Sequence, residues 1–342
     1  MFPDILLLAL SLALILGASV LFTNAVEMLG ERLGMHQGAT GSILAAVGTA
    51  LPETVIPIIA ILWFRDAAAQ NVAVGAIAGA PFMLGTLAFF VTGAAVFIFA
   101  RLRRRTVTMK VDMNVFSRDM TFFLACYGLA VGATFFHEQF QIKAAVAVIL
   151  LAAYVYYTYV TIKGKAAELE DVEELYLCRL FKMQPGMLWV VIQILVSLGI
   201  MVFGAHLFVG CTKEVAEMAG ISPLVLSLII TPVATELPEK CNSVLWIGRK
   251  KDALAIGNIT GAMVFQSCFP VAFGLVGTHW DLIHENHGVT MYSAVVTLAC
   301  GALILAVAKF AKGKVGKILP WLLLSGGFFY ALFIVHLLRQ KM

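Results

Sequence analysis

Ten stretches of mainly apolar residues follow one another along the chain, each long enough to form a membrane-spanning helix. Such a helix needs roughly 20 apolar residues to cross a hydrocarbon core of roughly 30 Å, because lipid offers no partner for unpaired backbone groups. We therefore predict an all-α polytopic membrane protein with ten transmembrane helices. The approximate bounds of the stretches are 4–24, 38–62, 71–100, 118–136, 142–162, 187–210, 222–247, 253–277, 289–309 and 318–338.

The composition excludes an ordinary soluble domain. Of the 342 residues, 61% are hydrophobic and only 13% are charged, which leaves too few polar side chains to cover a surface that faces water. The first stretch is predicted to stay as a helix and not to be cleaved as a signal peptide. Its start carries Asp4 without a Lys or Arg, and no clear small-x-small cleavage site follows it.

The positions of Lys and Arg predict the orientation, because these residues favour the cytoplasmic side of short loops. With the amino terminus outside, 18 of the 24 Lys and Arg residues fall in inner loops. Both termini are therefore predicted to face outward from a cell membrane, and the net charge of +4 needs no nucleic-acid partner. The exceptions are Arg65, Lys143, Lys213, Arg339 and Lys341, which fall outside, and Lys240, which lies within an apolar stretch.

A polar segment at 163–186 divides the chain into two halves of five predicted helices each. We interpret residues 1–162 as a first repeat and residues 187–342 as a second, joined by a cytoplasmic connecting loop. Since five is odd, the second half must enter the membrane from the opposite side and run inverted relative to the first. Inverted repeats in transporters commonly place the substrate site between them, near the midplane of the bilayer.

Similarity between the halves supports this division. Residues 34–61 align without gaps to residues 220–247, and residues 73–83 match residues 255–265. The string T-x-L-P-E occurs in both copies of the first pair, so the repeats are the candidate functional segments. The complete repeat motifs extend over 34–84 and 220–266.

The proline of each T-x-L-P-E copy predicts an interrupted helix. Proline has no backbone N–H, so Pro52 would leave the carbonyl of Gly48 without its helical partner, and Pro238 would do the same to Ala234. Such oxygens are costly to leave facing lipid, but they become ligands where they line a polar cavity. The predicted backbone ligands are Gly48, Thr49, Ala234 and Thr235.

A glutamate follows each proline, Glu53 in the first copy and Glu239 in the second. An ionised acid at this depth is costly and must find a partner. Two carboxylates with several released oxygens would provide the all-oxygen shell, typically 6 to 8 ligands, that Ca²⁺ prefers. Without a cation the carboxylates would repel one another and take up protons. The alternative is a kinked helix with a neutral, buried glutamic acid, although a kink alone needs no glutamate in both halves.

The strings "GTALPE" and "ATELPE", each followed by a helix with a G-x-x-x-G pattern, resemble the alpha repeats of the sodium/calcium exchanger family in the calcium:cation antiporter superfamily. The chain looks like a divergent prokaryotic-type member. The resemblance implies that Glu53 and Glu239 bind Ca²⁺, with Thr49 and Thr235 contributing mainly backbone oxygens. It also implies alternating access, in which the first and sixth helices slide against a bundle that holds the ion in the second, third, seventh and eighth.

The chain departs from the family pattern G-T-S-L-P-E and from the polar residues that the family carries in the third helix of each repeat. The family uses the missing side chains largely for sodium, so the coupling ion is left open between Na⁺ and H⁺. Gln266 and Asn258 are candidate replacements, with a helix-packing hydrogen bond as the alternative for Asn258. The departing positions are Ala50, Ala80, Leu84, Glu236, Ala262 and Gln266.

Glu236 and Lys240 stand four residues apart with the acid first, the favoured order for an ion pair on a helix. An intramembrane lysine needs a nearby counter-ion. We hypothesise that the Lys240 ammonium takes the place and the positive charge of a Na⁺ ion. The protein would then exchange a divalent cation for protons, or have an altered ion choice. The alternative is a self-neutralised pair that faces water at the end of the helix.

These features predict a secondary active antiporter that exchanges Ca²⁺, or a different divalent cation, for Na⁺ or H⁺. They imply inorganic cations and the lipid bilayer as its partners, with no organic cofactor and no protein partner. An uncoupled channel or uniporter is the alternative, and uptake of Ca²⁺ against its gradient, driven by a counter-ion gradient, would exclude it. An intramembrane enzyme is disfavoured because no nucleophile motif accompanies the paired acids.

Three histidines, His279, His284 and His287, lie in a segment predicted to face outward. A solvated loop is the favoured interpretation, with pH sensing or metal capture as the alternatives.

Overall fold

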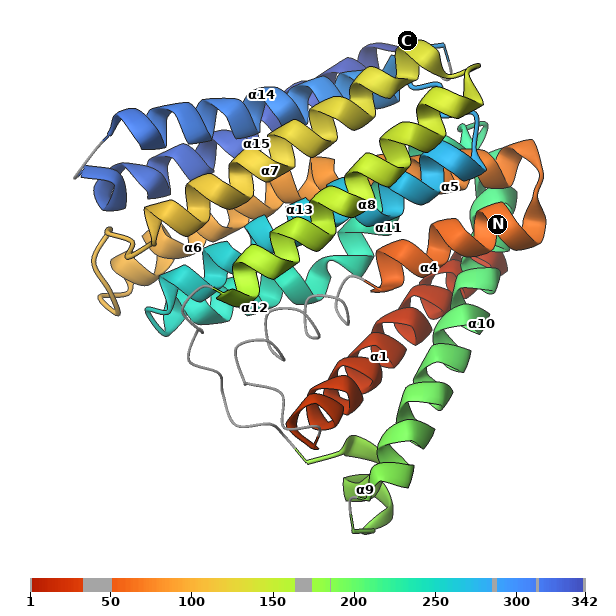
Figure 1. Ribbon diagram of the computed structural model, residues 1–342, viewed down its shortest axis with the longest axis horizontal. Helices are drawn as coiled ribbons and strands as arrows, with labels where there is room; N and C mark the ends of the chain where they lie inside the picture. The colour runs from red at the N-terminus through yellow and green to blue at the C-terminus, as the bar shows by residue number, and fades with distance from the viewer. Residues whose placement is uncertain are drawn as a thin grey trace.

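A computed structural model describes residues 2–32, 51–163, 174–184, 186–284, 288–311 and 314–340, and within them every regular element is a helix. Figure 1 shows these helices, which carry the labels used below. Their bounds are α1 Phe2–Arg32, α4 Leu51–Ile59, α5 Ala67–Met83, α6 Phe89–Arg101, α7 Met113–Gly132, α8 Phe140–Lys163, α9 Tyr176–Phe181, α10 Met187–Ala219, α11 Pro223–Thr235, α12 Leu237–Gly248, α13 Asp252–Gly277, α14 Val289–Phe310 and α15 Val315–Gln340.

Eight spans in the described part of the chain are long and apolar enough to cross a membrane. Two shorter apolar helices, Pro52–Phe64 and Pro223–Val233, lie in the second and seventh predicted stretches. The protein is therefore a multi-pass membrane protein, and each of the ten predicted stretches contains helix. The count of ten complete crossings stays a prediction, as does the outward orientation of the termini.

The helical geometry is irregular near a proline in the span that contains α5 and in the seventh predicted stretch. α5 contains Pro81 and continues into α6 through a π-helical turn at Leu84–Ala88, so the span Ala67–Arg101 is unbroken but locally widened. The seventh stretch is instead divided into α11 and α12 at Glu236. The connection predicted at 163–186 contains the short helix α9, in which Cys178 is buried and packs with residues of α1 and α10.

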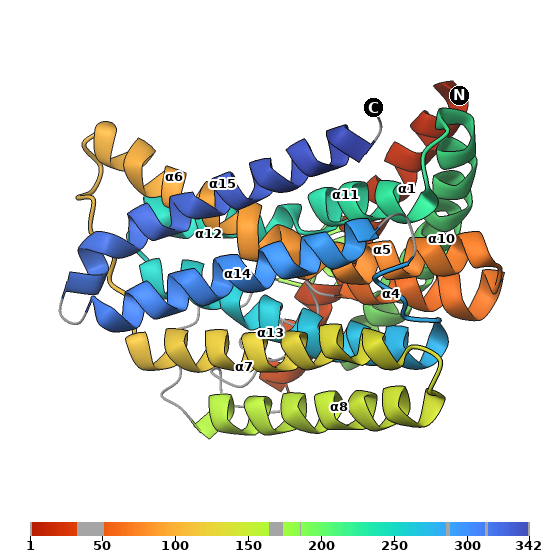
Figure 2. The same ribbon diagram turned by 90° about the horizontal axis from the view of Figure 1, so that it is seen from above.

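Helices from the two halves of the chain pack against one another. α1 and α10 run side by side along one flank of the molecule (Figures 1 and 2) and form a core cluster with α4 and α5. α5 packs against α11, and α13 packs against α4. In the predicted division of the chain, the third helix of each repeat would therefore contact the second helix of the other. α13 also contacts α7 and α8, while α15 covers α6 and α14. The glutamate-bearing helices α4 and α12 therefore each pack against helices from both halves of the chain.

A close helix crossing joins α5 to α11 at Gly75 and Gly79. A Cβ atom at Gly79 would overlap the Leu228 carbonyl oxygen and lie 2.6 Å from Cγ of Pro232. A Cβ at Gly75 would likewise overlap the Leu224 carbonyl oxygen. Small residues permit this approach, which is a common way to pack helices in lipid.

Gly79→Ala is expected to lower the free energy of unfolding by about 1–3 kcal/mol, because backbone atoms of α11 would have to move. The matched control is Gly128→Ala in α7, where an added Cβ meets no described atom within 4 Å. Alanine is the better helix former, so this control should be neutral or slightly stabilising. Thermal unfolding in detergent measures both variants, and equal melting temperatures would contradict the proposed close contact.

Asp66 starts α5 directly after the turn at Arg65, whose φ of 57° lies in the left-handed region. Its carboxylate accepts the backbone N–H of Ala69 at 2.8 Å and pairs with Lys213 of α10. Burial opposes ionisation of Asp66, but the hydrogen bonds from Lys213 and Ala69 outweigh it, so the pKa of Asp66 is lowered. This cap fixes the beginning of a helix that contacts both α4 and α11.

Asp66→Ala is expected to destabilise the protein by about 1 kcal/mol at neutral pH, the usual effect of losing a helix cap. Asp66→Asn keeps a capping oxygen and loses only an exposed ion pair, which contributes about 0–1 kcal/mol. Because the folded pKa is the lower one, the contribution of the charge is complete above the unfolded pKa and disappears as pH falls through the folded value. The melting temperature should therefore decrease less between neutral and acidic pH for Asp66→Asn than for the wild type. An equal decrease in both proteins would contradict this assignment.

Candidate functional site

The break between α11 and α12 brings a cluster of charged residues into the protein interior. α11 ends at Thr235, α12 begins at Leu237, and Glu236 stands between them. Pro238 occupies the first turn of α12, where its missing N–H cannot serve the carbonyl of Ala234. Helical hydrogen bonds remain on either side of this missing bond, since the Glu236 N–H donates to the Pro232 carbonyl and the Lys240 N–H donates to the Glu236 carbonyl, each at 3.2 Å. The interruption thus lies where the proline of the second T-x-L-P-E copy predicts it.

The first T-x-L-P-E copy begins α4. Pro52 and Glu53 stand in its first turn, and Glu53 is 1% exposed. Gly48, Thr49 and Ala50 lie outside the described residues, so their predicted contributions remain untested. Among the described residues, no hydrogen-bond donor reaches either carboxylate oxygen of Glu53. A buried carboxylate in this condition needs a proton or a cation.

Glu236 and Lys240 form an ion pair inside the protein. The Lys240 Nζ lies 3.4 Å from Oε2 of Glu236 and donates a hydrogen bond to the Pro232 carbonyl at 3.2 Å. The side chain of Glu236 is 1% exposed and that of Lys240 is 10% exposed. The pair is therefore buried among the helices and does not face water.

The four charged residues belong to one electrostatic cluster. Glu236 interacts with Lys240 and also with Glu53 and Glu239, and Lys240 in turn acts on Glu53. The structure thus brings the carboxyl groups of both T-x-L-P-E copies to one buried region, where α4 meets α11 and α13 (Figure 1). The cluster thus holds three carboxyl groups and one ammonium, so with all the carboxyl groups ionised it would carry net negative charge that a bound cation could offset.

The carboxyl groups approach one another without forming a closed cage. Glu53, Glu236 and Glu239 do not each have a carboxylate oxygen within 4.8 Å of the other two in the described part of the chain. Thr235 lies beside Glu53, but its hydroxyl donates to the Thr231 carbonyl at 2.9 Å. This bond uses the hydroxyl proton and leaves the lone pairs of the oxygen, so both the side-chain and the backbone oxygen of Thr235 remain candidate ligands.

Two polar residues of α13 are predicted as replacement ligands. The amide of Asn258 donates to the Glu239 carbonyl at 3.2 Å and lies 3.4 Å from the Ser243 hydroxyl, so it ties α13 to α12. Gln266 is 2% exposed, and its Oε1 accepts no hydrogen bond from the described residues. Asn258 thus makes the helix-packing bond foreseen as its alternative role, while the carbonyl of Gln266 stays available.

A buried acid of α7 lies outside the sequence-based site. Asp119 of α7 is 2% exposed, accepts a hydrogen bond from the Thr260 hydroxyl at 2.8 Å and pairs with Arg118 at 2.8 Å. It therefore connects α7 to the middle of α13. The signal in the sequence is a carboxylate inside an apolar stretch, which is a candidate functional residue by default.

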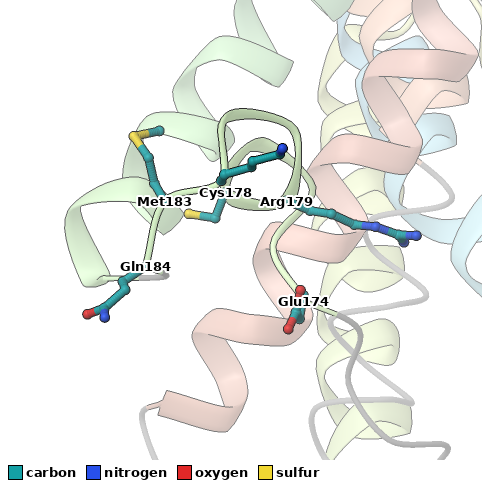
Figure 3. Close-up of a pocket in the computed structure, with 6 residues that line it drawn as sticks. Glu174, Cys178, Arg179, Met183 and Gln184 are labelled. Carbon is teal, nitrogen blue, oxygen red and sulfur yellow. The ribbon is translucent and has the colours of Figure 1, made fainter.

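A surface hollow of about 350 Å³ beside α9 is unrelated to this cluster. Figure 3 shows its lining side chains pointing in different directions, so they offer no convergent set of ligands. The residues labelled there are Glu174, Cys178, Arg179, Met183 and Gln184.

Comparisons with known proteins assign both a family and a fold. The sequence model of a family described as sodium/calcium exchanger protein matches residues 4–163 and 189–339. An uncharacterized membrane protein of Methanocaldococcus jannaschii is 26% identical over 195 residues, which are 57% of this chain. The chain matches 57% of the length of that relative.

The chain also resembles solved structures at low sequence identity. A crystal structure of the H⁺/Ca²⁺ exchanger CAX has a TM-score of 0.66 and 16% identity, with 99% of this chain and 90% of that chain covered. The sodium-calcium exchanger NCX_Mj, soaked with 2.5 mM Na⁺ and 0.1 mM Ca²⁺, has a TM-score of 0.56 and 21% identity, with 100% of both chains covered. These likenesses establish the fold.

Proposed function

Because this chain belongs to the sodium/calcium exchanger protein family, we propose that it is a secondary active antiporter that exchanges Ca²⁺ for Na⁺ or H⁺. The ion is bound between the two repeats and released by alternating access, with both termini outside. The observation that carries the proposal is the burial of Glu53, Glu236 and Glu239 in one electrostatic cluster within a membrane-spanning helical fold.

Glu53 and Glu239 bind the transported cation in this proposal. Their carboxylates come from different repeats, so each repeat contributes a ligand and movement between the repeats can open the site to either side. Backbone oxygens released by the two prolines complete the shell, as Ca²⁺ prefers many oxygen ligands. The proposed backbone ligands are Gly48, Thr49, Ala234 and Thr235.

Lys240 sets the choice of coupling ion in this proposal. Its ammonium contacts a backbone carbonyl and a carboxylate, two ligand types that a monovalent metal ion also uses. The permanent positive charge of Lys240 offsets part of the carboxylate charge in the cluster, so less negative charge is left for Na⁺ to compensate. Protons are then the favoured counter-ion, taken up by the buried carboxylates when the divalent cation leaves.

A flux assay in reconstituted liposomes tests the function. Uptake of ⁴⁵Ca²⁺ is measured with a pH gradient, a Na⁺ gradient or no gradient, and other divalent cations are tested as competitors. We expect accumulation of Ca²⁺ against its own gradient when protons move the other way. Uptake that only follows the Ca²⁺ gradient would identify a channel or uniporter and overturn the antiport proposal.

A further inference from the structure

A second cluster of metal-ligating side chains lies far along the chain from the glutamates. His137 follows α7 in the connection to α8, while Asp281 and His284 follow α13 in the connection to α14. Figure 2 shows both connections at the same end of these helices. One ligand atom from each residue lies within 4.8 Å of the other two, and this is the only such trio among the described residues.

The two connections are held together by hydrogen bonds that do not involve the trio. The Thr134 hydroxyl donates to the Trp280 carbonyl at 3.1 Å and accepts the N–H of Leu282 at 2.9 Å. The buried Trp280 donates its indole N–H to the Ala130 carbonyl at 2.9 Å. Lys143 of α8 donates to the Thr278 carbonyl at 2.9 Å. These bonds fix the backbones of the two connections relative to one another beside the trio.

The hydrogen bonds that His137 and Asp281 make to the backbone leave Nε2 of His137 and Oδ2 of Asp281 for a shared ion. The Thr134 carbonyl can only accept, so the contact at 3.0 Å with Nδ1 of His137 places the proton on that nitrogen and leaves the Nε2 lone pair free. Oδ1 of Asp281 accepts the backbone N–H groups of Ile283 and His284, each at 3.0 Å. The other oxygen, Oδ2, lies 2.9 Å from Nδ1 of His284 and 3.9 Å from Nε2 of His137.

We propose that His137, Asp281 and His284 form a Zn²⁺-binding site that clamps the α7–α8 connection to the α13–α14 connection. Two imidazoles and one carboxylate form a ligand set typical of Zn²⁺, with water as the fourth ligand. Such sites use hydrogen bonds between ligands and backbone groups as outer-shell support; here His137 donates to a backbone carbonyl and Asp281 accepts from two backbone N–H groups. Ca²⁺ prefers an all-oxygen shell, so the site is distinct from that of the proposed transport substrate.

The closing movement that metal binding requires is small. Metal–ligand bonds of about 2.0–2.2 Å in a tetrahedron bring ligand atoms to about 3.3–3.6 Å from one another. The separations at Oδ2 of Asp281 already bracket this range. The side chain of His284 is 71% exposed and that of His137 is 28% exposed, so both imidazoles can turn toward a shared ion.

Titration of Zn²⁺ into the purified full chain in detergent tests the site, with isothermal calorimetry as the readout. We expect one Zn²⁺ per chain, a higher melting temperature with Zn²⁺ than with EDTA, and a loss of affinity of tenfold or more in His137→Ala and in Asp281→Asn. The matched control is His279→Ala, an exposed histidine of the same connection, which should bind Zn²⁺ as the wild type does. Melting temperatures in EDTA verify that each variant is folded.

Co²⁺ provides a second readout that does not depend on transport. Its visible absorption spectrum is expected to show tetrahedral nitrogen and oxygen coordination in the wild type, and to lose this signal in His137→Ala. Zn²⁺ binding that is unchanged in His137→Ala would overturn the proposal. So would binding that persists in His137→Ala but disappears in Glu53→Gln, because the ion would then occupy the intramembrane carboxylates.

Discussion

Glu53→Gln is expected to reduce Ca²⁺ uptake by about 100-fold or more, the largest effect we predict for a single substitution. Glutamine keeps the shape and one oxygen of the side chain but removes the charge that opposes a divalent cation. Loss of one partner from a buried charged interaction costs about 3–5 kcal/mol, and each 1.4 kcal/mol changes affinity about tenfold. Glu53 is buried and receives no hydrogen bond from the described residues, so its charge depends on a proton or a cation for compensation.

The experiment separates loss of the site from loss of the fold. Glu239→Gln is expected to have a similarly large effect, since the proposal treats the two repeats as equal contributors. Glu217→Gln is the control, because Glu217 lies exposed near the end of α10 and changes charge in the same way. Uptake is measured in liposomes with equal amounts of folded protein. Wild-type Ca²⁺ uptake by Glu53→Gln would remove the central claim of the proposed function.

The helices and their interruption follow from local features of the sequence. An apolar stretch flanked by charged residues fixes a membrane helix whatever surrounds it, so each predicted stretch contains helix in the structure. Pro238 acts within one turn, so the division between α11 and α12 needs no long-range contact to predict. The duplication of T-x-L-P-E then identifies Glu53 and Glu239 as candidates before any geometry is known.

Contacts between distant segments escape this kind of prediction. Nothing near His137 in the sequence indicates that its Nε2 lies 3.9 Å from Oδ2 of Asp281, because this approach depends on how α7 and α13 pack. The hydrogen bond from Thr260 to Asp119 depends on the same packing. The burial of Lys240 also needed the structure, since one sequence spacing suits both a water-facing pair and an enclosed one.

Lys240→Ala is expected to change the coupling ion from H⁺ toward Na⁺. Removing the ammonium leaves Glu236 buried without its counter-ion and opens space beside the Pro232 carbonyl, a setting that attracts a monovalent cation. We expect the ratio of Na⁺-driven to H⁺-driven Ca²⁺ uptake to rise by about tenfold, which corresponds to a change of about 1.4 kcal/mol in relative ion affinity. Uptake by wild-type and variant liposomes under separate Na⁺ and pH gradients measures this ratio.

Stability provides a check on Lys240→Ala that is independent of transport. Breaking a buried ion pair destabilises a protein by about 3–5 kcal/mol, so the variant should melt earlier in Na⁺-free buffer. Added Na⁺ should restore part of the loss in Lys240→Ala, because the ion replaces the ammonium beside Glu236, and should not affect the wild type. Lys213→Ala is the matched control, since it removes a lysine from the exposed pair with Asp66. If Lys240→Ala keeps the wild-type coupling ion and gains no stability from Na⁺, the ammonium of Lys240 does not stand in for a transported cation.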